Sequence, residues 1–282
     1  MNSLLSRCLI LFGLLIVPLT NAEQLPSSSQ RLLALSPHSV EMLFAIGAGD
    51  RIIGTVDFAD YPEQAKSIPR IGSYRHIDIE KVLRMQPDLV IVSASDTSET
   101  ILAQLTKLGL PVFNTSVGSI ENIPERLRSL GKVTQLEKQA EQAANDFSQR
   151  LQQLRSIYQG RKPVKVFYQV WPEPLTTVSG GWLEQMVEEC SGVNVFADSL
   201  SAYPQVSMEQ VLIARPEIIL MPRHHGVAEN LNVWQKWQTI PAVKKGQLYQ
   251  INGDLVNRAG PRLLDGMQLV CEHLADARAQ YD

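Results

Sequence analysis

Residues 74–91 read YRHIDIEKVLRMQPDLVI, and residues 203–220 read YPQVSMEQVLIARPEIIL. The two stretches align without a gap, and tyrosine, glutamate, a Val-Leu pair and proline recur at matching positions. Aliphatic residues replace aliphatic residues between these matches. Internal similarity of this kind indicates a repeated structural unit. The chain is therefore predicted to consist of two related halves.

Short apolar runs alternate with helix patterns around these stretches. In the first half, strand patterns occupy 31–35, 51–56, 89–92 and 111–113, and helix patterns occupy 39–47, 78–86 and 98–108. In the second half, strand patterns occupy 164–170, 217–221 and 246–251, and helix patterns occupy 182–189, 207–215, 233–237 and 261–277. Ser39 and Asp78 suit helix N-caps, and Pro87 ends the helix that Asp78 begins. The alternation predicts an α/β fold with a mainly parallel sheet in each half.

Residues 119–160 differ from both halves because their pattern is nearly all helical. Apolar side chains recur at spacings of three, four and seven from Leu136 to Tyr158. A helix over 135–158 has a length of about 35 Å at 1.5 Å per residue, enough to run along both lobes. A shorter helix precedes it, with Pro124 in its first turn and Gly131 weakening its continuation. We expect a ligand cleft between the lobes and the following segments: signal peptide 1–22, N-terminal α/β lobe 23–119, helical connector 120–160, C-terminal α/β lobe 161–282.

The first 22 residues have the pattern of a secretory signal peptide. Arg7 precedes an apolar run over 8–19, and residues 20–22 read Thr-Asn-Ala, with small residues first and third. We expect export and cleavage after Ala22. The alternative, a single membrane anchor, is disfavoured because the apolar run over 8–19 is too short to span about 30 Å of hydrocarbon. Cleavage removes one basic and no acidic residue, so the formal charge changes from −3 to −4. This acidic balance disfavours nucleic acid as a partner.

The mature chain keeps two cysteines, Cys190 and Cys271. In an exported protein, an even pair most simply forms one disulfide, and two buried thiols are the alternative. Two distant cysteines supply too few ligands for a zinc site.

Enzyme motifs are mostly absent from the sequence. No glycine-rich dinucleotide or phosphate loop and no Gly-x-Ser-x-Gly elbow occurs. His224 and His225 are the only adjacent histidines, and neighbours of this kind in a loop are more often solvated than metal ligands. We therefore expect no metal site and no enzyme, and keep a secreted two-domain α/β hydrolase as a remote alternative.

Four aromatic residues lie in loops next to predicted strands, at comparable points of the two halves: Phe58, Tyr74, Trp171 and Tyr203. Trp171 belongs to a predicted loop at 171–174. Ligand loops of open α/β sheets occupy such positions, and stacked rings suit a large flat ligand. The alternative is that the rings only seal the bases of the loops. The paired placement favours ligand binding.

Glu80 and Glu209 occupy matching positions in the repeated stretches, in the first turn of a predicted helix. Each carboxylate could serve only to compensate the helix dipole. Alternatively, each could present a negative charge, one per lobe, to arginines of a partner. Duplication alone is consistent with both interpretations.

Several short motifs resemble one known family. Over nearly its full mature length the chain resembles periplasmic substrate-binding proteins of ABC importers for vitamin B12 and iron complexes, in which one long helix joins two lobes. Within this family it is most similar to the cobalamin-binding branch. The similar motifs are Leu-Ser-Pro at 35–37, Asp-Tyr-Pro at 60–62, IEKVL at 79–83, QPDLV at 86–90, YPQVS-x-EQVL at 203–212 and RAGPR at 258–262.

The resemblance implies roles for particular residues. Glu80 and Glu209 would dock on arginines of the inner-membrane permease, which works with an ATPase. The aromatic residues would line a corrin cleft together with a polar pair, Asp254 and Arg258. Cys190 and Cys271 match the paired cysteines of the cobalamin branch.

The implied protein is a periplasmic, monomeric carrier of cobalamin (vitamin B12) or a related corrinoid. A carrier of haem or a ferric siderophore is the alternative. Haem would need an axial ligand such as Tyr74 or His76. A siderophore would need cationic groups such as Arg75, Arg223 and Arg258.

Overall fold

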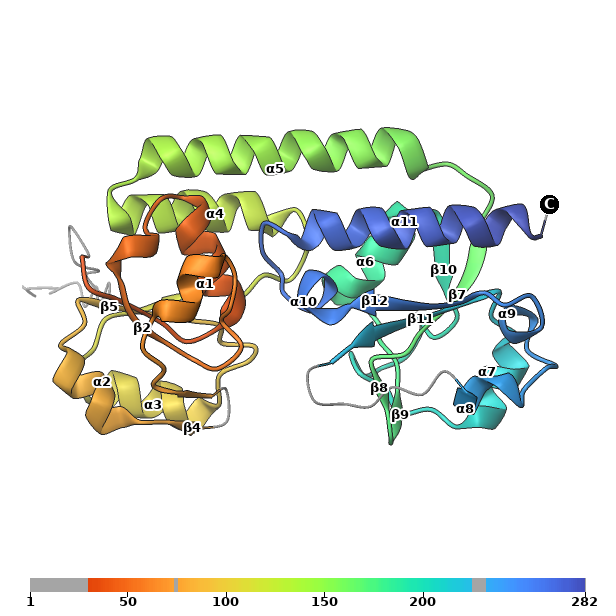
Figure 1. Cartoon of the computed structure of the whole chain (residues 1–282), viewed down its shortest axis with the longest axis horizontal. Helices are drawn as coiled ribbons and strands as arrows, with labels where there is room; N and C mark the ends of the chain where they lie inside the picture. Colours follow the sequence, from red (N-terminus) through yellow and green to blue (C-terminus); the bar gives the residue numbers. More distant parts are fainter. Residues whose placement is uncertain (1–29, 74–75, 225–231, 282) are drawn as a thin grey trace, which may run out of the picture.

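The computed structural model describes residues 30–73, 76–224 and 232–281. It consists of two α/β lobes placed side by side along one long helix, α5 (Glu137–Tyr158) (Figure 1). The predicted signal peptide lies outside the described residues. Among the described residues, no helix is both long and apolar enough to cross a membrane.

The N-terminal lobe contains a four-stranded sheet with the order β2-β1-β5-β6, in which all neighbouring strands are parallel. Alternate residues of β1 point to opposite faces, so Leu32 packs with α1 and α4 while Leu33 packs with α2 and α3. The elements are β1 (Leu32–Ala34), α1 (Pro37–Ala45), β2 (Ile52–Thr55), the pair β3 (Gly72–Ser73) and β4 (His76–Ile77), α2 (Ile79–Met85), β5 (Leu89–Val92), α3 (Glu99–Lys107), β6 (Val112–Asn114) and α4 (Asn122–Thr134).

The C-terminal lobe repeats this architecture. Its parallel sheet has the order β10-β7-β11-β12, which is the order of the first sheet with each strand replaced by its counterpart. The predicted duplication and fold class are thereby confirmed. The elements are β7 (Val164–Tyr168), β8 (Trp171–Pro172), β9 (Leu175–Thr176), α6 (Gly181–Glu189), β10 (Gly192–Asn194), α7 (Met208–Ala214), β11 (Ile218–Arg223), α8 (Asn232–Gln235), α9 (Pro241–Lys244), β12 (Leu248–Asn252), α10 (Gly253–Val256) and α11 (Leu263–Ala279).

The repeated stretches form the same local structure. Asp78 caps α2 by accepting from the Lys81 amide at 2.9 Å, and Ser207 caps α7 in a capping box. Both helices end at a residue in the left-handed conformation, Gln86 or Arg215, which directly precedes the matching proline. The predicted ends of α2 and α7 are therefore confirmed.

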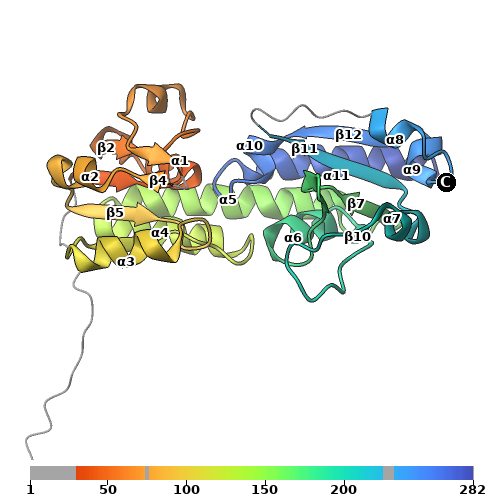
Figure 2. The ribbon, with the colours of Figure 1, turned by 90° about the horizontal axis from the view of Figure 1, so that it is seen from below.

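Helix α5 connects the lobes. It packs against α4 and α1 of the N-terminal lobe and against α11 of the C-terminal lobe, and Figure 2 shows it running past both sheets. Helix α4 ends at Thr134, three residues after Gly131, in agreement with the predicted separate helix before α5. A Cβ at Gly131 would lie 2.3 Å from the Cβ of Ala140, so this glycine lets α4 and α5 approach closely.

Two local predictions were wrong. Ser36, and not Ser39, caps α1, because Pro37 takes the first helical position and the Ser39 amide donates to Ser36 Oγ at 3.3 Å. The predicted loop at 171–174 belongs to the antiparallel hairpin β8-β9. Strand β10 and the short helices α9 and α10 were not predicted.

A disulfide joins Cys190, at the end of α6, to Cys271 in α11. The two residues are 81 positions apart in the chain, and both are fully buried. The disulfide therefore links α11 covalently to the end of α6, directly before strand β10 of the C-terminal sheet.

Candidate functional site

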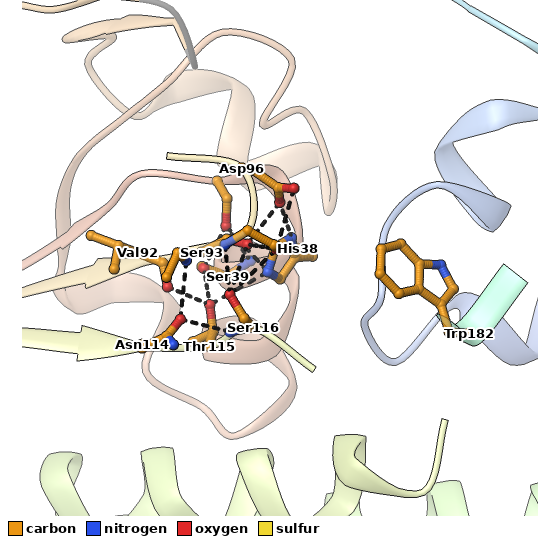
Figure 3. Close-up of polar contacts among 12 residues, drawn as sticks. His38, Ser39, Val92, Ser93, Asp96, Asn114, Thr115, Ser116 and Trp182 are labelled. Atoms are coloured by element: carbon orange, nitrogen blue, oxygen red, sulfur yellow. Dashed lines mark hydrogen bonds and ion pairs between the residues drawn. The ribbon is translucent and has the colours of Figure 1, made fainter. Parts of the chain in front are cut away.

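Polar side chains follow three neighbouring strands of the N-terminal sheet at their carboxyl ends, where parallel sheets place ligand sites. They are His38 after β1, Ser93 and Asp96 after β5, and Thr115 and Ser116 after β6 (Figure 3). Ser93 Oγ donates to Asp96 Oδ2 at 2.7 Å, and the Ser95 amide donates to Ser116 Oγ at 3.0 Å. Ser39, which follows β1, lies with its Oγ 2.7 Å from Thr115 Oγ1, so the three strand ends are joined into one hydrogen-bonded wall.

His38 lies at the buried base of this wall. Its Nε2 is 3.4 Å from Thr115 Oγ1 and 3.5 Å from Ser36 Oγ, and its Nδ1 is 3.9 Å from Asp96 Oδ2. Burial lowers the pKa of His38, although the nearby Asp96 carboxylate opposes the shift and Arg258 adds to it. His38 is therefore neutral at physiological pH, and Asp96, which is half exposed, is the charged member of the wall.

Trp182 and Tyr203 of the C-terminal lobe form the opposite wall. Figure 3 shows Trp182, at the start of α6, on the other side from the polar residues, and its Nε1 donates to the Val256 carbonyl at 3.2 Å. A pocket of about 280 Å³ lies between the lobes. Burial, and then the charge of Asp96, raise the pKa of Tyr203, so its hydroxyl stays neutral. The pocket is lined by Ser95, Asp96, Val117, Gly118, Val178, Gly180, Gly181, Trp182, Leu183, Ala202 and Tyr203.

Ion pairs connect the two lobes. Arg258, after α10, donates to Glu41 Oε1 at 3.1 Å, Asp60 Oδ1 at 3.2 Å and Asp254 Oδ1 at 2.7 Å. Arg262 also binds Glu41, at 3.0 and 2.6 Å. We call these five residues the interlobe ionic cluster. Because Arg258 and Glu41 are nearly fully buried, removing either partner is expected to cost about 3–5 kcal/mol of folding free energy.

Two other predicted aromatic residues, Phe58 and Trp171, do not line the 280 Å³ pocket. Phe58, after β2, has a half-exposed ring, and its carbonyl accepts from Arg258 Nη2 at 2.9 Å. Trp171, in β8, packs on His224 with ring centroids 4.9 Å apart, and His224 contacts the Val170 carbonyl at 2.7 Å. Tyr74, with its neighbour Arg75, and His225 lie outside the described residues.

Glu80 and Glu209 lie on the first turns of α2 and α7, and neither lines the 280 Å³ pocket. Both helices are on the side of the molecule opposite α5 (Figure 1). The Glu80 side chain is 88% exposed and 3.7 Å from Arg84. A hydrogen bond from Ser207, followed by one from the backbone, lowers the pKa of Glu209. Both positions therefore present a carboxylate to solvent on the same face.

Comparisons with known proteins agree with this architecture. A model of a family described as "Periplasmic binding protein" matches residues 32–255. The chain belongs to this family. It is 35% identical to the vitamin B12-binding protein of Vibrio cholerae serotype O1, over 98% of both chains. It is 33% identical to the vitamin B12-binding protein of Yersinia pestis, over 96% of this chain and 92% of that one.

Solved structures from the periplasmic binding protein family have the same fold. The crystal structure of the periplasmic vitamin B12-binding protein of Vibrio cholerae superposes with a TM-score of 0.82 at 35% identity, covering 90% of this chain and 99% of that one. A periplasmic haem-binding protein from Roseiflexus sp. RS-1 superposes with a TM-score of 0.79 at 22% identity, covering 89% and 99%. The second similarity shows the shared fold alone.

Sequence reasoning missed several residues of the site in this periplasmic binding protein. His38, Asp96 and Ser116 could have been found, because each follows a predicted parallel strand. Trp182 could have been found as an aromatic residue at the start of a predicted helix. Glu41 offered no such signal, because its partner Arg258 is 217 positions away.

The arrangement has the features of a binding site. One wall carries hydrogen-bonding groups and a carboxylate, and the other carries aromatic rings. Among residues 30–73, 76–224 and 232–281, no group of three or more His, Cys, Asp or Glu side chains is placed to hold a metal ion. His76, in β4, pairs with Ser73 of β3 and lines a groove that also includes Glu80 and none of the residues of the polar wall.

Proposed function

We propose that this protein is the periplasmic substrate-binding protein of an ABC importer and that it captures cobalamin or a related corrinoid. The observation that carries the proposal is the 35% identity, over 98% of both chains, to a vitamin B12-binding protein. The protein then acts as a carrier and not as an enzyme, and delivers its ligand to an inner-membrane permease with its ATPase.

The two walls of the cleft suit the chemistry of a corrinoid, a flat macrocycle with amide side chains. Rings such as Trp182 and Tyr203 offer stacking surfaces, each contributing on the order of 1 kcal/mol beyond area burial. Ser95, Asp96 and Ser116 offer hydrogen-bond partners to amides. A corrinoid is larger than the 280 Å³ pocket, so binding requires the cleft to widen.

The proposed ligand contacts also include the four loop aromatic residues predicted from the sequence. We assign Phe58, Trp171 and Tyr203 to the ligand, as well as Tyr74, which lies outside the described residues. Asp254 and Arg258, which form a hydrogen-bonded pair, are assigned to the ligand as well.

Glu80 and Glu209 are proposed as the carboxylates that dock on the permease, because both are exposed on the face opposite α5. The proposal also includes export with cleavage after Ala22, a monomeric carrier, and the division into lobes at 23–119 and 161–282 around a connector at 120–160.

Calorimetric titration of the purified mature protein with cyanocobalamin tests the proposal. We expect saturable heat at one site per chain and a ligand-induced rise in the melting temperature. Neither heat nor a thermal shift at high micromolar cyanocobalamin would refute the corrinoid proposal. A parallel titration with haemin distinguishes a haem carrier from a corrinoid carrier, because haem ligated by a protein side chain gives a changed Soret band.

A further inference from the structure

Ile213, in helix α7, is an aliphatic side chain that lies almost entirely in solvent. Its exposed fraction is 81%, whereas Val211, two residues earlier in the same helix, is fully buried. A single exposed aliphatic residue needs no explanation by itself. The position of Ile213 is informative, however, because it lies four residues after Glu209 and therefore on the same solvent face of α7.

The matching helix of the N-terminal lobe carries a cation at this position. In the repeated stretches, Arg84 follows Glu80 as Ile213 follows Glu209. Arg84 lies 3.7 Å from the Glu80 carboxylate and partly neutralises it. The groups that lower the pKa of Glu209 are the Ser207 hydroxyl and the backbone, and not a cation. The C-terminal lobe thus presents a charged carboxylate beside an apolar side chain.

This pair of side chains fits one kind of partner. Helices α2 and α7 lie on the side of the molecule opposite α5, which is the face proposed to meet the permease (Figure 1). Side chains four residues apart on a helix have Cβ atoms about 5–6 Å apart. An arginine combines a guanidinium that pairs with a carboxylate and an aliphatic stem that covers apolar surface. One arginine can therefore contact Glu209 and Ile213 together.

We propose that Ile213 is a further contact of the C-terminal lobe with the permease, in which one permease arginine binds Glu209 and packs its aliphatic stem on Ile213. At the N-terminal lobe, Arg84 competes with the partner for the Glu80 carboxylate. The C-terminal lobe therefore docks more tightly than the N-terminal lobe. The inference rests on the proposed docking role of the two glutamates and adds the residue that distinguishes the two lobes.

The test measures binding of the cyanocobalamin-loaded mature protein to the permease–ATPase complex of the same organism in lipid nanodiscs. Ile213→Arg, which introduces the residue found in the other lobe, should weaken docking by about fivefold, because the new cation pairs with Glu209 and repels the partner arginine. Ile213→Ala should weaken docking by about threefold through lost apolar contact. Ile213→Leu should dock within about twofold of the wild type, as should the control Leu200→Ala, at a fully exposed leucine of the same lobe.

The same variants separate docking from folding and ligand binding. Because Ile213 is exposed, its variants are expected to keep the melting temperature and the cyanocobalamin affinity of the wild type. A fall in cyanocobalamin affinity as large as the fall in docking would show that Ile213 acts through the fold, and would overturn the proposal.

A double-mutant cycle tests whether one arginine serves both residues. Glu209→Gln should weaken docking by about fivefold and Glu80→Gln by about twofold, because Arg84 already neutralises part of the Glu80 charge. Glu209→Gln with Ile213→Ala should dock within about twofold of Glu209→Gln alone, since the two losses share one partner side chain. Losses that multiply in the double variant, or equal losses at the two glutamates, overturn the proposal.

The outcomes also separate this inference from the proposed function. If the wild type docks and both Ile213→Arg and Ile213→Ala dock equally well, the inference fails while the proposed function stands. If the wild type binds cyanocobalamin but does not dock, the docking role of Glu80 and Glu209 fails, and the inference is overturned with it.

Discussion

Glu80 and Glu209 are each the second residue of a seven-residue helix, and the two helices occupy the same place in their lobes. The neighbours of the two glutamates differ. Glu80 lies 3.7 Å from Arg84, whereas the position that matches Arg84 is Ile213, which is 81% exposed. The two helices therefore share the exposed carboxylate, but not the residue four positions after it.

Replacing both glutamates should separate transport from binding. Glu80→Ala with Glu209→Ala is expected to leave cyanocobalamin affinity within about twofold of the wild type, while cellular uptake falls by about an order of magnitude. Glu99→Ala is the matched control, because Glu99 is an exposed glutamate in the first turn of α3. Calorimetry and uptake of labelled cobalamin measure the two effects. Loss of affinity in the double variant would show that the docking role is wrong.

Tyr203 should contribute through its ring. Tyr203→Ala is expected to weaken cyanocobalamin binding by about five- to tenfold, since a stacked ring contributes on the order of 1 kcal/mol. Tyr203→Phe should bind within about twofold of the wild type, because the ring remains. Leu200→Ala, in the same loop and fully exposed, is the control. Calorimetry gives all four affinities, and a large loss in Tyr203→Phe would contradict the stacking role.

His38 should make stability depend on pH. Its pKa is lowered in the folded protein, chiefly by burial, so between that pKa and about 6.5 the unfolded chain binds more protons. Stability is therefore expected to fall as the pH falls below about 6.5, by up to about 1.4 kcal/mol per pH unit for one group. The free energy of unfolding of His38→Asn, measured with urea, should fall less steeply between pH 7 and pH 5. Part of the decline should remain in this variant, because burial also lowers the pKa of His273. Equal slopes in the two proteins would contradict this assignment.

The disulfide should contribute strongly to stability. Replacing Cys190 and Cys271 by alanine opens a loop of 81 residues and is expected to lower the free energy of unfolding by about 4–5 kcal/mol in the chain-entropy model. Urea unfolding measures the difference. A reducing agent should lower the wild type to a similar stability and leave the double variant unchanged. A double variant as stable as the wild type would contradict the stabilising role of the bond.

The hydroxyl of Tyr168 is buried and has no hydrogen-bond partner among the described residues. Tyr168→Phe is therefore expected to keep the stability of the wild type or to raise it by about 1–3 kcal/mol. Tyr249→Phe is the contrast, since the Tyr249 hydroxyl donates to Gln247 Oε1 at 2.9 Å, and its removal should cost about 1 kcal/mol. Urea unfolding measures both. Greater destabilisation in Tyr168→Phe would indicate a partner of its hydroxyl.

Most of the fold could be predicted because its signals are local. Asp78 and Pro87 mark the two ends of α2, and the predicted start of α5 differs from Glu137 by two residues. The hairpin at Trp171 was missed because two-residue strands give no periodicity. Of the interlobe ionic cluster, Asp254 and Arg258 were named as a polar pair, but Glu41, Asp60 and Arg262 were missed for a different reason. The partners in this cluster come together only when both lobes are folded, so the sequence around Glu41 contains no sign of Arg262.

Each sheet is drawn from one uninterrupted part of the chain, residues 32–114 and 164–252, and the chain passes between them once. This makes the lobes candidates for exchange between relatives by simple splicing within the connector. A chimera would still have to combine Glu41 and Asp60 from one parent with Arg258 and Arg262 from the other, because these side chains meet only where the lobes touch. The compatibility of two parents at this contact can therefore be judged from four positions before any hybrid is made.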